Sequence, residues 1–115
     1  MIARRLAGVA LVLMGAFVFA CGGETSTRRT DSLDPSTMPE GIRADFQVFA
    51  DRCSKCHSLS RPLGSGIDSD EHWQRTVERM RRHPGSGISK EDTVVILRFL
   101  HYFVVQQKEE SAHLP

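Results

Sequence analysis

Two cysteines and a histidine lie within five residues, in the segment Cys53-Ser54-Lys55-Cys56-His57. Because two residues separate the cysteines, a helical turn there places both thiols on one side of the chain, with the imidazole of His57 beside them. The chain has 115 residues, which is the length of one small domain. The motif therefore constrains the fold strongly, because a small domain must be built around these three side chains.

Several kinds of site use a closely spaced cysteine pair, but most of them have no use for the adjacent histidine. A thioredoxin-like dithiol belongs in a βαβ context, and a structural disulfide leaves His57 without a role. A zinc site needs a second pair of ligands, and no cysteine follows Cys56. C-x-x-C-H is the attachment sequence of c-type haem, in which two thiols bond the porphyrin vinyl groups and the histidine ligates iron. We therefore expect one covalent haem c on Cys53, Cys56 and His57.

The amino-terminal segment reads as an export signal. A positive stretch, residues 1–5, precedes an apolar run of 15 residues, 6–20, which is shorter than the about 20 residues of a membrane-spanning helix. The run ends in Val18-Phe19-Ala20-Cys21, which resembles the lipobox of bacterial lipoprotein precursors. The resemblance implies a signal peptide over 1–20 and a lipid anchor on Cys21. It also implies sorting to the outer membrane, because Gly22 rather than an aspartate follows Cys21. The alternative is an ordinary signal peptide with an incidental cysteine.

The charge and composition of the chain after residue 20 indicate which partners are expected and how the chain is divided into segments. Without residues 1–20, 13 Lys and Arg face 14 Asp and Glu, so no basic excess is left to bind nucleic acid, and none is expected as a partner. Residues 21–41 are polar and rich in Gly, Thr, Ser and Pro, which predicts a flexible tether. A haem domain is expected over 42–107, followed by a polar tail, 108–115.

Within that domain the apolar spacing predicts three helices and no strand, and so an all-α bundle of about three helices wrapped around the haem. The first helix, from about Ile42, carries apolar residues on the face that leads to Cys53. The third helix runs from a capping pair, Ser89 and Asp92, to about Gln107. Its apolar face is expected to cross the first helix and close the core. The members of these two faces are Phe46, Phe49, Ala50 and Cys53 in the first helix, and Ile96, Phe99, Leu100 and Phe103 in the third.

The second helix is predicted from about Ser69 to His83, between the pair Asp68 and Glu71 and the breaker Pro84-Gly85. Its apolar stripe consists of Trp73, Thr76, Val77 and Met80, and we expect it to face the haem.

Met80 is the expected sixth iron ligand, a soft thioether delivered from the stripe that also carries Trp73. Two alternatives stay open: methionine at helical spacing is also common core filler, and a histidine could replace it as ligand. The candidate histidines are His72, His83 and His101, of which His83 lies closest along the chain. The cluster Arg79, Arg81 and Arg82 is either a partner for the haem propionates or simply a solvated helix face.

The segment after the motif, 58–67, contains leucine, proline and two glycines, which favours a loop around the haem edge. A ligating histidine usually donates its second ring proton to a carbonyl or carboxylate, and we expect a backbone carbonyl near Arg61 to accept it from His57.

Taken together, C-x-x-C-H, the Trp73-x-x-x-Val77-x-x-Met80 pattern, the glycine turn and the hydrophobic last helix resemble the single-haem bacterial c-type cytochromes. The resemblance covers about residues 42–107. It implies the cytochrome c-like fold, His57 and Met80 as axial ligands, and one-electron transfer between redox partner proteins on the periplasmic side of a membrane. No enzymatic activity and no small-molecule substrate are expected. The alternatives are a haem subunit of a larger periplasmic dehydrogenase complex and a haem-based ligand sensor with an open sixth site.

Overall fold

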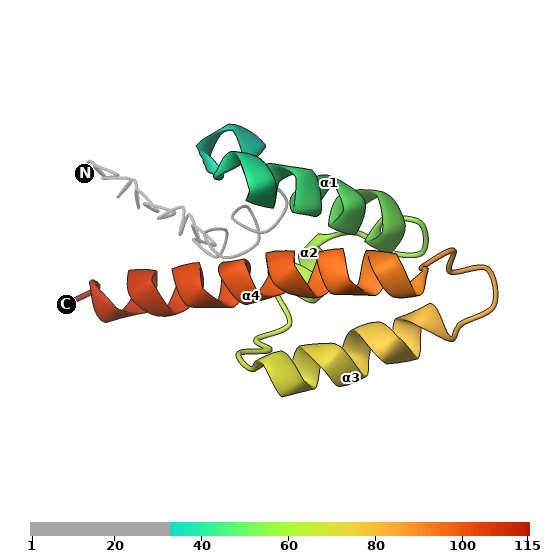
Figure 1. Ribbon diagram of the computed structural model, residues 1–115. Helices are drawn as coiled ribbons and strands as arrows, with labels where there is room; N and C mark the ends of the chain where they lie inside the picture. The colour runs from blue at the N-terminus through green and yellow to red at the C-terminus, as the bar shows by residue number, and fades with distance from the viewer. Residues whose placement is uncertain (1–32) are drawn as a thin grey trace, which may run out of the picture.

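The computed structural model describes residues 33–115, and this part of the chain is entirely helical, without a strand (Figure 1). The elements are a 3-10 turn, η1 (Pro35–Thr37), and four α-helices, α1 (Glu40–Cys53), α2 (Ser60–Leu63), α3 (Asp70–Arg81) and α4 (Lys90–Ala112). The predicted all-α class is confirmed for these residues. The expected signal peptide, most of the tether and Cys21 lie outside the described residues.

Helix α4 is the centre of the fold, because α1 and α3 each pack against it and not against each other. In Figure 1, α4 runs through the middle of the molecule, with α1 above it in the opposite direction and α3 below. A helix with partners on two sides needs apolar residues around much of its circumference. The middle of α4 meets this requirement with buried residues at five positions, Ile96, Phe99, Leu100, Phe103 and Val104.

Aromatic rings join α1 to α4. The ring centroid of Phe99 lies 4.7 Å from that of Phe49 and 5.2 Å from that of Phe46, and Phe103 extends the cluster at 6.3 Å from Phe99. Tilted and edge-on contacts at these separations are favourable beyond their buried area. The predicted contact between the first and the last helix is therefore confirmed, and it lies one turn before Cys53.

A buried ion pair accompanies the rings. The side chain of Asp45 in α1 is only 4% exposed. It accepts hydrogen bonds from Nε and Nη2 of Arg98 in α4, the second at 2.6 Å. These bonds raise the pKa of the Arg98 guanidinium. The pair lies on the same α1–α4 interface as the phenylalanines, and it supplies the polar atoms of Asp45 with the partners that a buried carboxylate requires.

The start of α4 follows the prediction closely. The backbone N–H of Asp92 donates to the hydroxyl of Ser89 at 2.9 Å, and the backbone N–H of Ser89 donates to the carboxylate of Asp92 at 3.0 Å. This is a complete capping box. Helix α3 differs from the prediction, because Ser69 is its N-cap rather than Asp68, and its last residue is Arg81 rather than His83.

The structure also extends or adds elements that we did not expect. Met38, placed in the predicted tether, is buried in the core, so the folded part begins before Ile42. Helix α4 continues to Ala112 because no glycine or proline interrupts residues 107–112, which are mostly good helix formers. The short helix α2 lies within the predicted loop, where Leu63 gains a buried position.

Candidate functional site

The C-x-x-C-H segment lies at the carboxyl end of α1. Cys53 is the last helical residue, and the backbone N–H of Ser54 still donates to the carbonyl of Ala50 at 3.1 Å. The residues from Ser54 to Cys56 form a turn. Cys53 packs against the core, whereas Cys56 is exposed. The helix therefore presents one thiol at the edge of the core and the other to solvent, and both are free in the structure.

The two thiols lie in different surroundings. Burial raises the pKa of the Cys53 thiol to about 11, because a low-dielectric environment disfavours the charged thiolate. Cys53 is thus held as a neutral thiol near neutral pH. A neutral thiol is a poorer nucleophile than a thiolate, so burial lowers the intrinsic reactivity of Cys53.

His57 is half-buried, and its Nδ1 lies 3.0 Å from the carbonyl oxygen of Ser58. When Nδ1 carries the ring proton it donates to this carbonyl, and Nε2 keeps its lone pair for a metal. The accepting carbonyl is that of the next residue, and not one near Arg61 as the sequence suggested. The local turn therefore orients the imidazole without help from the rest of the loop.

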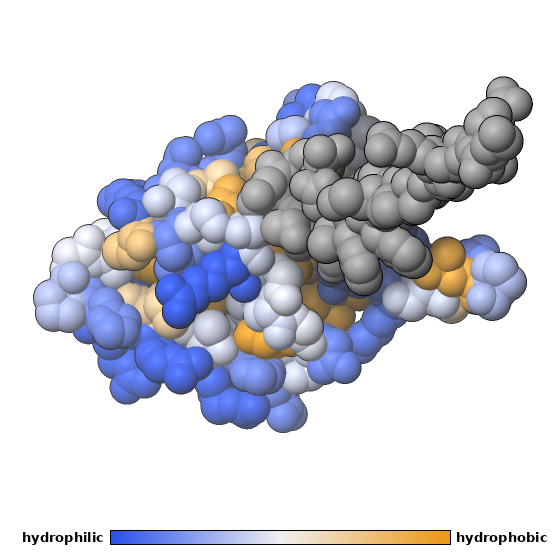
Figure 2. Space-filling view, turned by 180° about the vertical axis from the view of Figure 1, so that it is seen from behind, coloured by the Kyte–Doolittle hydropathy of each residue, from blue (hydrophilic) through white to orange (hydrophobic). Residues whose placement is uncertain are grey.

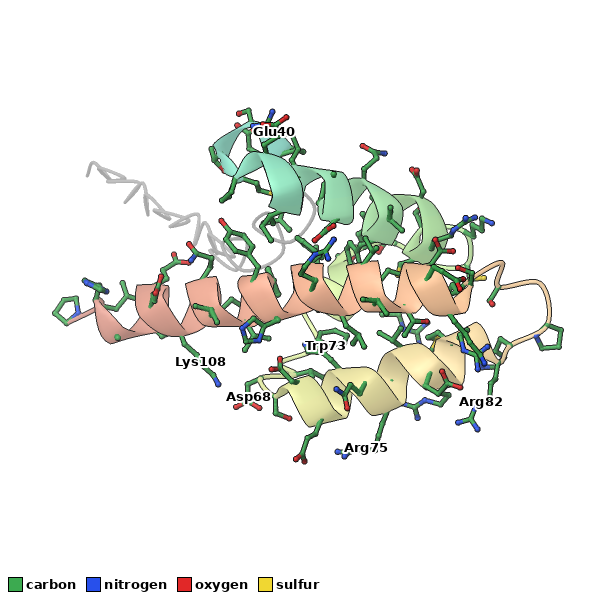
Figure 3. The ribbon with its side chains drawn as sticks, in the orientation of Figure 1. Glu40, Asp68, Trp73, Arg75, Arg82 and Lys108 are labelled. Atoms are coloured by element: carbon green, nitrogen blue, oxygen red, sulfur yellow. The ribbon has the colours of Figure 1, made fainter. Side chains whose placement is uncertain are left out.

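Trp73 lies on the inner face of α3, between α3 and α4 (Figure 3). Its side chain is only 3% exposed, and its indole Nε1 is a buried donor without a hydrogen-bond partner among the described residues. An unsatisfied buried N–H costs about 1–3 kcal/mol. An acceptor from a bound group, such as a haem propionate, would remove this cost. The Trp73 N–H is therefore a buried donor that a bound group with an acceptor oxygen would satisfy.

Met80 lies in the last turn of α3, on the stripe that carries Trp73 and Val77. Trp73 and Val77 are buried, but Met80 is only partly buried and is not one of the side chains that form or pack against the core. Its burial pattern is therefore not that of core filler. The end of α3 that carries Met80 lies at the same end of the molecule as the motif (Figure 1).

The rival histidines have other surroundings. His72 and His83 are exposed. His101, on α4, has its Nδ1 2.9 Å from a carboxylate oxygen of Asp70 at the start of α3. The three histidines therefore differ from Met80, which is partly buried.

The loop between α3 and α4 and the start of α4 both lie against the motif and the residue before it. Gly87 has a φ of +66°, and a Cβ built on it would lie 2.9 Å from Nζ of Lys55, inside the motif. Arg52, one residue before Cys53, forms a 2.9 Å ion pair with Asp92 of the α4 capping box. The ends of α1 and α3 and the start of α4 are therefore packed together, although α1 and α3 do not contact each other directly.

A cavity lies on another part of α4. It has a volume of about 890 Å³ and is open to solvent. None of the five expected site residues in the folded part lines it, so the structure does not gather Cys53, Cys56, His57, Trp73 and Met80 around one cavity. The loop after the motif contributes to its wall, together with η1 and the second half of α4; lining residues include Met38, Leu63, Gly64, Phe99, Tyr102 and Phe103. Sequence reasoning missed Met38, because it lies in a polar stretch.

The described residues contain neither a larger metal-binding cluster nor a membrane-spanning helix. No group of three or more His, Cys, Asp and Glu side chains there is arranged to hold a metal ion, and none of the described helices meets the length and hydropathy of a membrane span. A haem iron takes only two protein ligands, so a larger cluster is not needed for the expected site.

Comparison of the chain with protein-family models, with curated proteins and with solved structures gave no match.

Proposed function

We propose that this chain is an exported, lipid-anchored electron carrier that holds one haem c covalently and passes single electrons between partner proteins. The observation that carries the proposal is the C-x-x-C-H segment at the end of α1, with Nδ1 of His57 3.0 Å from the Ser58 carbonyl. That contact leaves Nε2 available, as a metal-ligating histidine requires.

Each of the expected residues has a defined task in this proposal. Cys53 and Cys56 would hold the haem, each by adding its S–H across one porphyrin vinyl group to form a thioether, and His57 and Met80 would ligate its iron. The buried N–H of Trp73 provides a donor for a propionate. When bound, the haem supplies a one-electron ferric/ferrous couple, and thioether ligation favours the ferrous form compared with two histidines.

The test is the absorption spectrum of the protein made in cells with a working cytochrome c maturation system. We expect a coloured protein whose ferric form has a weak far-red band typical of thioether ligation. Met80→Ala should abolish this band, whereas His83→Ala, the matched control three residues away, should keep it. Replacing Cys53 and Cys56 together by alanine should give a colourless chain.

Three results would contradict the proposal. A colourless wild-type protein would show that no haem is attached. A far-red band that survives Met80→Ala would show that Met80 is not the iron ligand. Ready binding of carbon monoxide by the reduced wild-type protein would indicate an open sixth site, and with it a ligand sensor rather than an electron carrier.

The lipid anchor has its own test. We expect the wild-type chain in the membrane fraction and a Cys21→Ser variant in the soluble periplasmic fraction, because two or more acyl chains are needed for a stable anchor. Equal partitioning of both proteins would contradict lipidation at Cys21.

A further inference from the structure

Helix α3 is held in the fold by α4 alone. Within residues 33–115 it packs against α4 and against no other helix. Its two buried side chains, Trp73 and Val77, lie on one face, and the surface along the lower edge of Figure 2, where α3 lies, is mostly hydrophilic. Because the apolar face of α3 is narrow, a polar contact between α3 and α4 has a direct influence on how firmly α3 is docked.

One ion pair joins these two helices. Nδ1 of His101 in α4 lies 2.9 Å and 3.1 Å from the two carboxylate oxygens of Asp70, which is the first residue of α3. In the described part of the chain, no other side chain of α3 is hydrogen-bonded or ion-paired to α4. The pair therefore fastens the first turn of α3 to the middle of α4.

The pair lies at a small cleft between the helices. The cleft has a volume of about 230 Å³ and is open to solvent. Each helix contributes three lining residues: Asp70, Trp73 and Gln74 from α3, and Leu97, Arg98 and His101 from α4. The buried tryptophan thus lies beside the pair, and a movement of the first turn of α3 away from α4 would widen the cleft and bring water to this side chain.

The charged groups around His101 leave its imidazole as the group whose charge changes near neutral pH. Arg98, one turn earlier on α4, is bound by Asp45 of α1. Two further carboxylates at the start of α3, Asp68 and Glu71, are exposed and form no ion pair with His101 within residues 33–115. Carboxylates and guanidinium groups keep their charge between pH 5 and pH 8, whereas histidine is the residue type that changes its charge there.

We propose that Asp70 and His101 form a pH-sensitive latch that docks α3 on α4. The protonated imidazole attracts the carboxylate as an ion, whereas the neutral imidazole keeps only the hydrogen bond from Nδ1. Docking therefore favours the protonated form, so the stabilisation is present below neutral pH and decreases as the pH rises. Because α3 also carries Met80, the latch makes the docking of that residue's helix depend on pH. The latch needs no haem, so it does not rest on the proposed function.

The exposure of the two side chains sets the size of the effect. His101 is 61% exposed and Asp70 is 56% exposed. Water screens a pair of this kind, so the charge should change the docking equilibrium of α3 by about two- to fivefold. A change of this size is sufficient to alter local opening of one helix without unfolding the rest of the domain.

The experiment measures hydrogen exchange by NMR on the mature chain at pH 5.5 and pH 8.0, with any haem in the ferrous state. Rates are expressed as protection factors, which removes the intrinsic effect of pH on exchange. The probes are the amides of α3 and the indole N–H of Trp73, the single tryptophan of the chain. In the wild type we expect about two- to fivefold higher protection of α3 at pH 5.5 than at pH 8.0, and no such change in α1.

Substitutions on each side of the latch have matched controls. His101→Gln and Asp70→Asn should each remove the pH dependence, and the double variant should add nothing further, because either change alone breaks the pair. His113→Gln replaces another exposed histidine, whose Nδ1 lies 2.7 Å from the carbonyl oxygen of Glu109 and not near α3. Glu71→Gln removes a neighbouring carboxylate from the first turn of α3. Both control variants should keep the pH dependence of the wild type.

Four results would overturn the proposal. Equal protection of α3 at both pH values in the wild type would show that the pair does not respond to pH. A pH dependence that survives His101→Gln would assign the response to another group. An equal loss in His113→Gln would indicate net charge alone, and an equal change in α1 and α3 would indicate the stability of the whole domain. All of these measurements can be made on a colourless chain, so failure of the proposed function and failure of the latch are distinguishable.

Discussion

Arg98 contacts Asp45 with two nitrogen atoms across the α1–α4 interface, and the two side chains differ sharply in exposure. The carboxylate of Asp45 is 4% exposed, whereas the Arg98 side chain is 59% exposed. Asp45 is shielded from water and therefore depends on Arg98 for its hydrogen bonds, whereas Arg98 can also bind water.

This asymmetry predicts unequal effects of the two single substitutions. Asp45→Asn leaves Arg98 free to be hydrated and should lower the free energy of unfolding by about 1.5–3 kcal/mol, the typical loss for a hydrogen bond to a charged group. Arg98→Met should be the more damaging change, because it leaves a buried carboxylate unpaired. Urea unfolding of both variants measures the difference. An equal loss, or a smaller one for Arg98→Met, would show that the carboxylate is hydrated in solution.

Asp92 predicts a pH dependence of stability. Its pKa is lowered from 3.8, first by the hydrogen bond from the Ser89 backbone and further by the charge of Arg52. Because the folded pKa lies below the unfolded one, this stabilisation is present above about pH 4 and is lost as the pH falls through the folded pKa. Asp92→Asn should cost about 1 kcal/mol at pH 7. In thermal unfolding measured from pH 7 to pH 3, the difference from wild type should shrink towards the acid end. A difference that does not change with pH would contradict the role of the charge.

The two glycines of the α3–α4 loop provide a matched pair. Gly85 and Gly87 both have positive φ, but a Cβ on Gly85 meets open space, whereas one on Gly87 meets Lys55 Nζ at 2.9 Å. Alanine at either position should cost about 1–2 kcal/mol from the left-handed backbone conformation. The extra cost at Gly87 should be small, because the atom met there is the end of the flexible Lys55 side chain. Chemical denaturation compares the two variants, and a clearly larger loss for Gly87→Ala would show that Lys55 cannot move aside.

Trp73 links the fold to the proposed haem. Trp73→Phe removes the unpartnered buried N–H while keeping an aromatic ring. If that N–H serves a propionate, the variant with haem bound should lose the donor, and the pH dependence of its reduction potential should move because the propionate then titrates at a higher pH. Redox titration over a range of pH makes the comparison, with Val77→Ala as a control that perturbs the same helix face without removing a donor. An unchanged pH dependence would indicate that the Trp73 N–H has no part in binding a propionate.

Local features of the fold were predicted well from the sequence. The capping box of Ser89 and Asp92 and the helical face that carries Phe46, Phe49 and Cys53 depend on residues only three to seven positions apart. The N-cap of α3 was misplaced by one residue, because Asp68 and Ser69 are both good capping residues and their order along the chain does not decide between them.

The features that were missed depend on distant parts of the chain. Asp45 looks like a solvated residue beside Phe46, and its burial becomes understandable only when Arg98, 53 residues later, lies opposite it. Met38 is buried because η1 folds back onto the core, and nothing in its polar surroundings indicates this.

By itself, the sequence determined the three longer helices, the capped start of α4, and the close grouping of Cys53, Cys56 and His57, because these follow from hydrogen bonds and spacing within one or two turns. Only the tertiary structure decided that α4 lies between α1 and α3, that Trp73 is buried with an unpartnered N–H, and that Met80 is left at the edge of the core. It also brought Asp70 and His101, 31 residues apart in the chain, into contact. The physical reason is that burial and contacts between helices depend on which helices pack together, and that choice depends on the free energy of the whole core rather than on any local pattern.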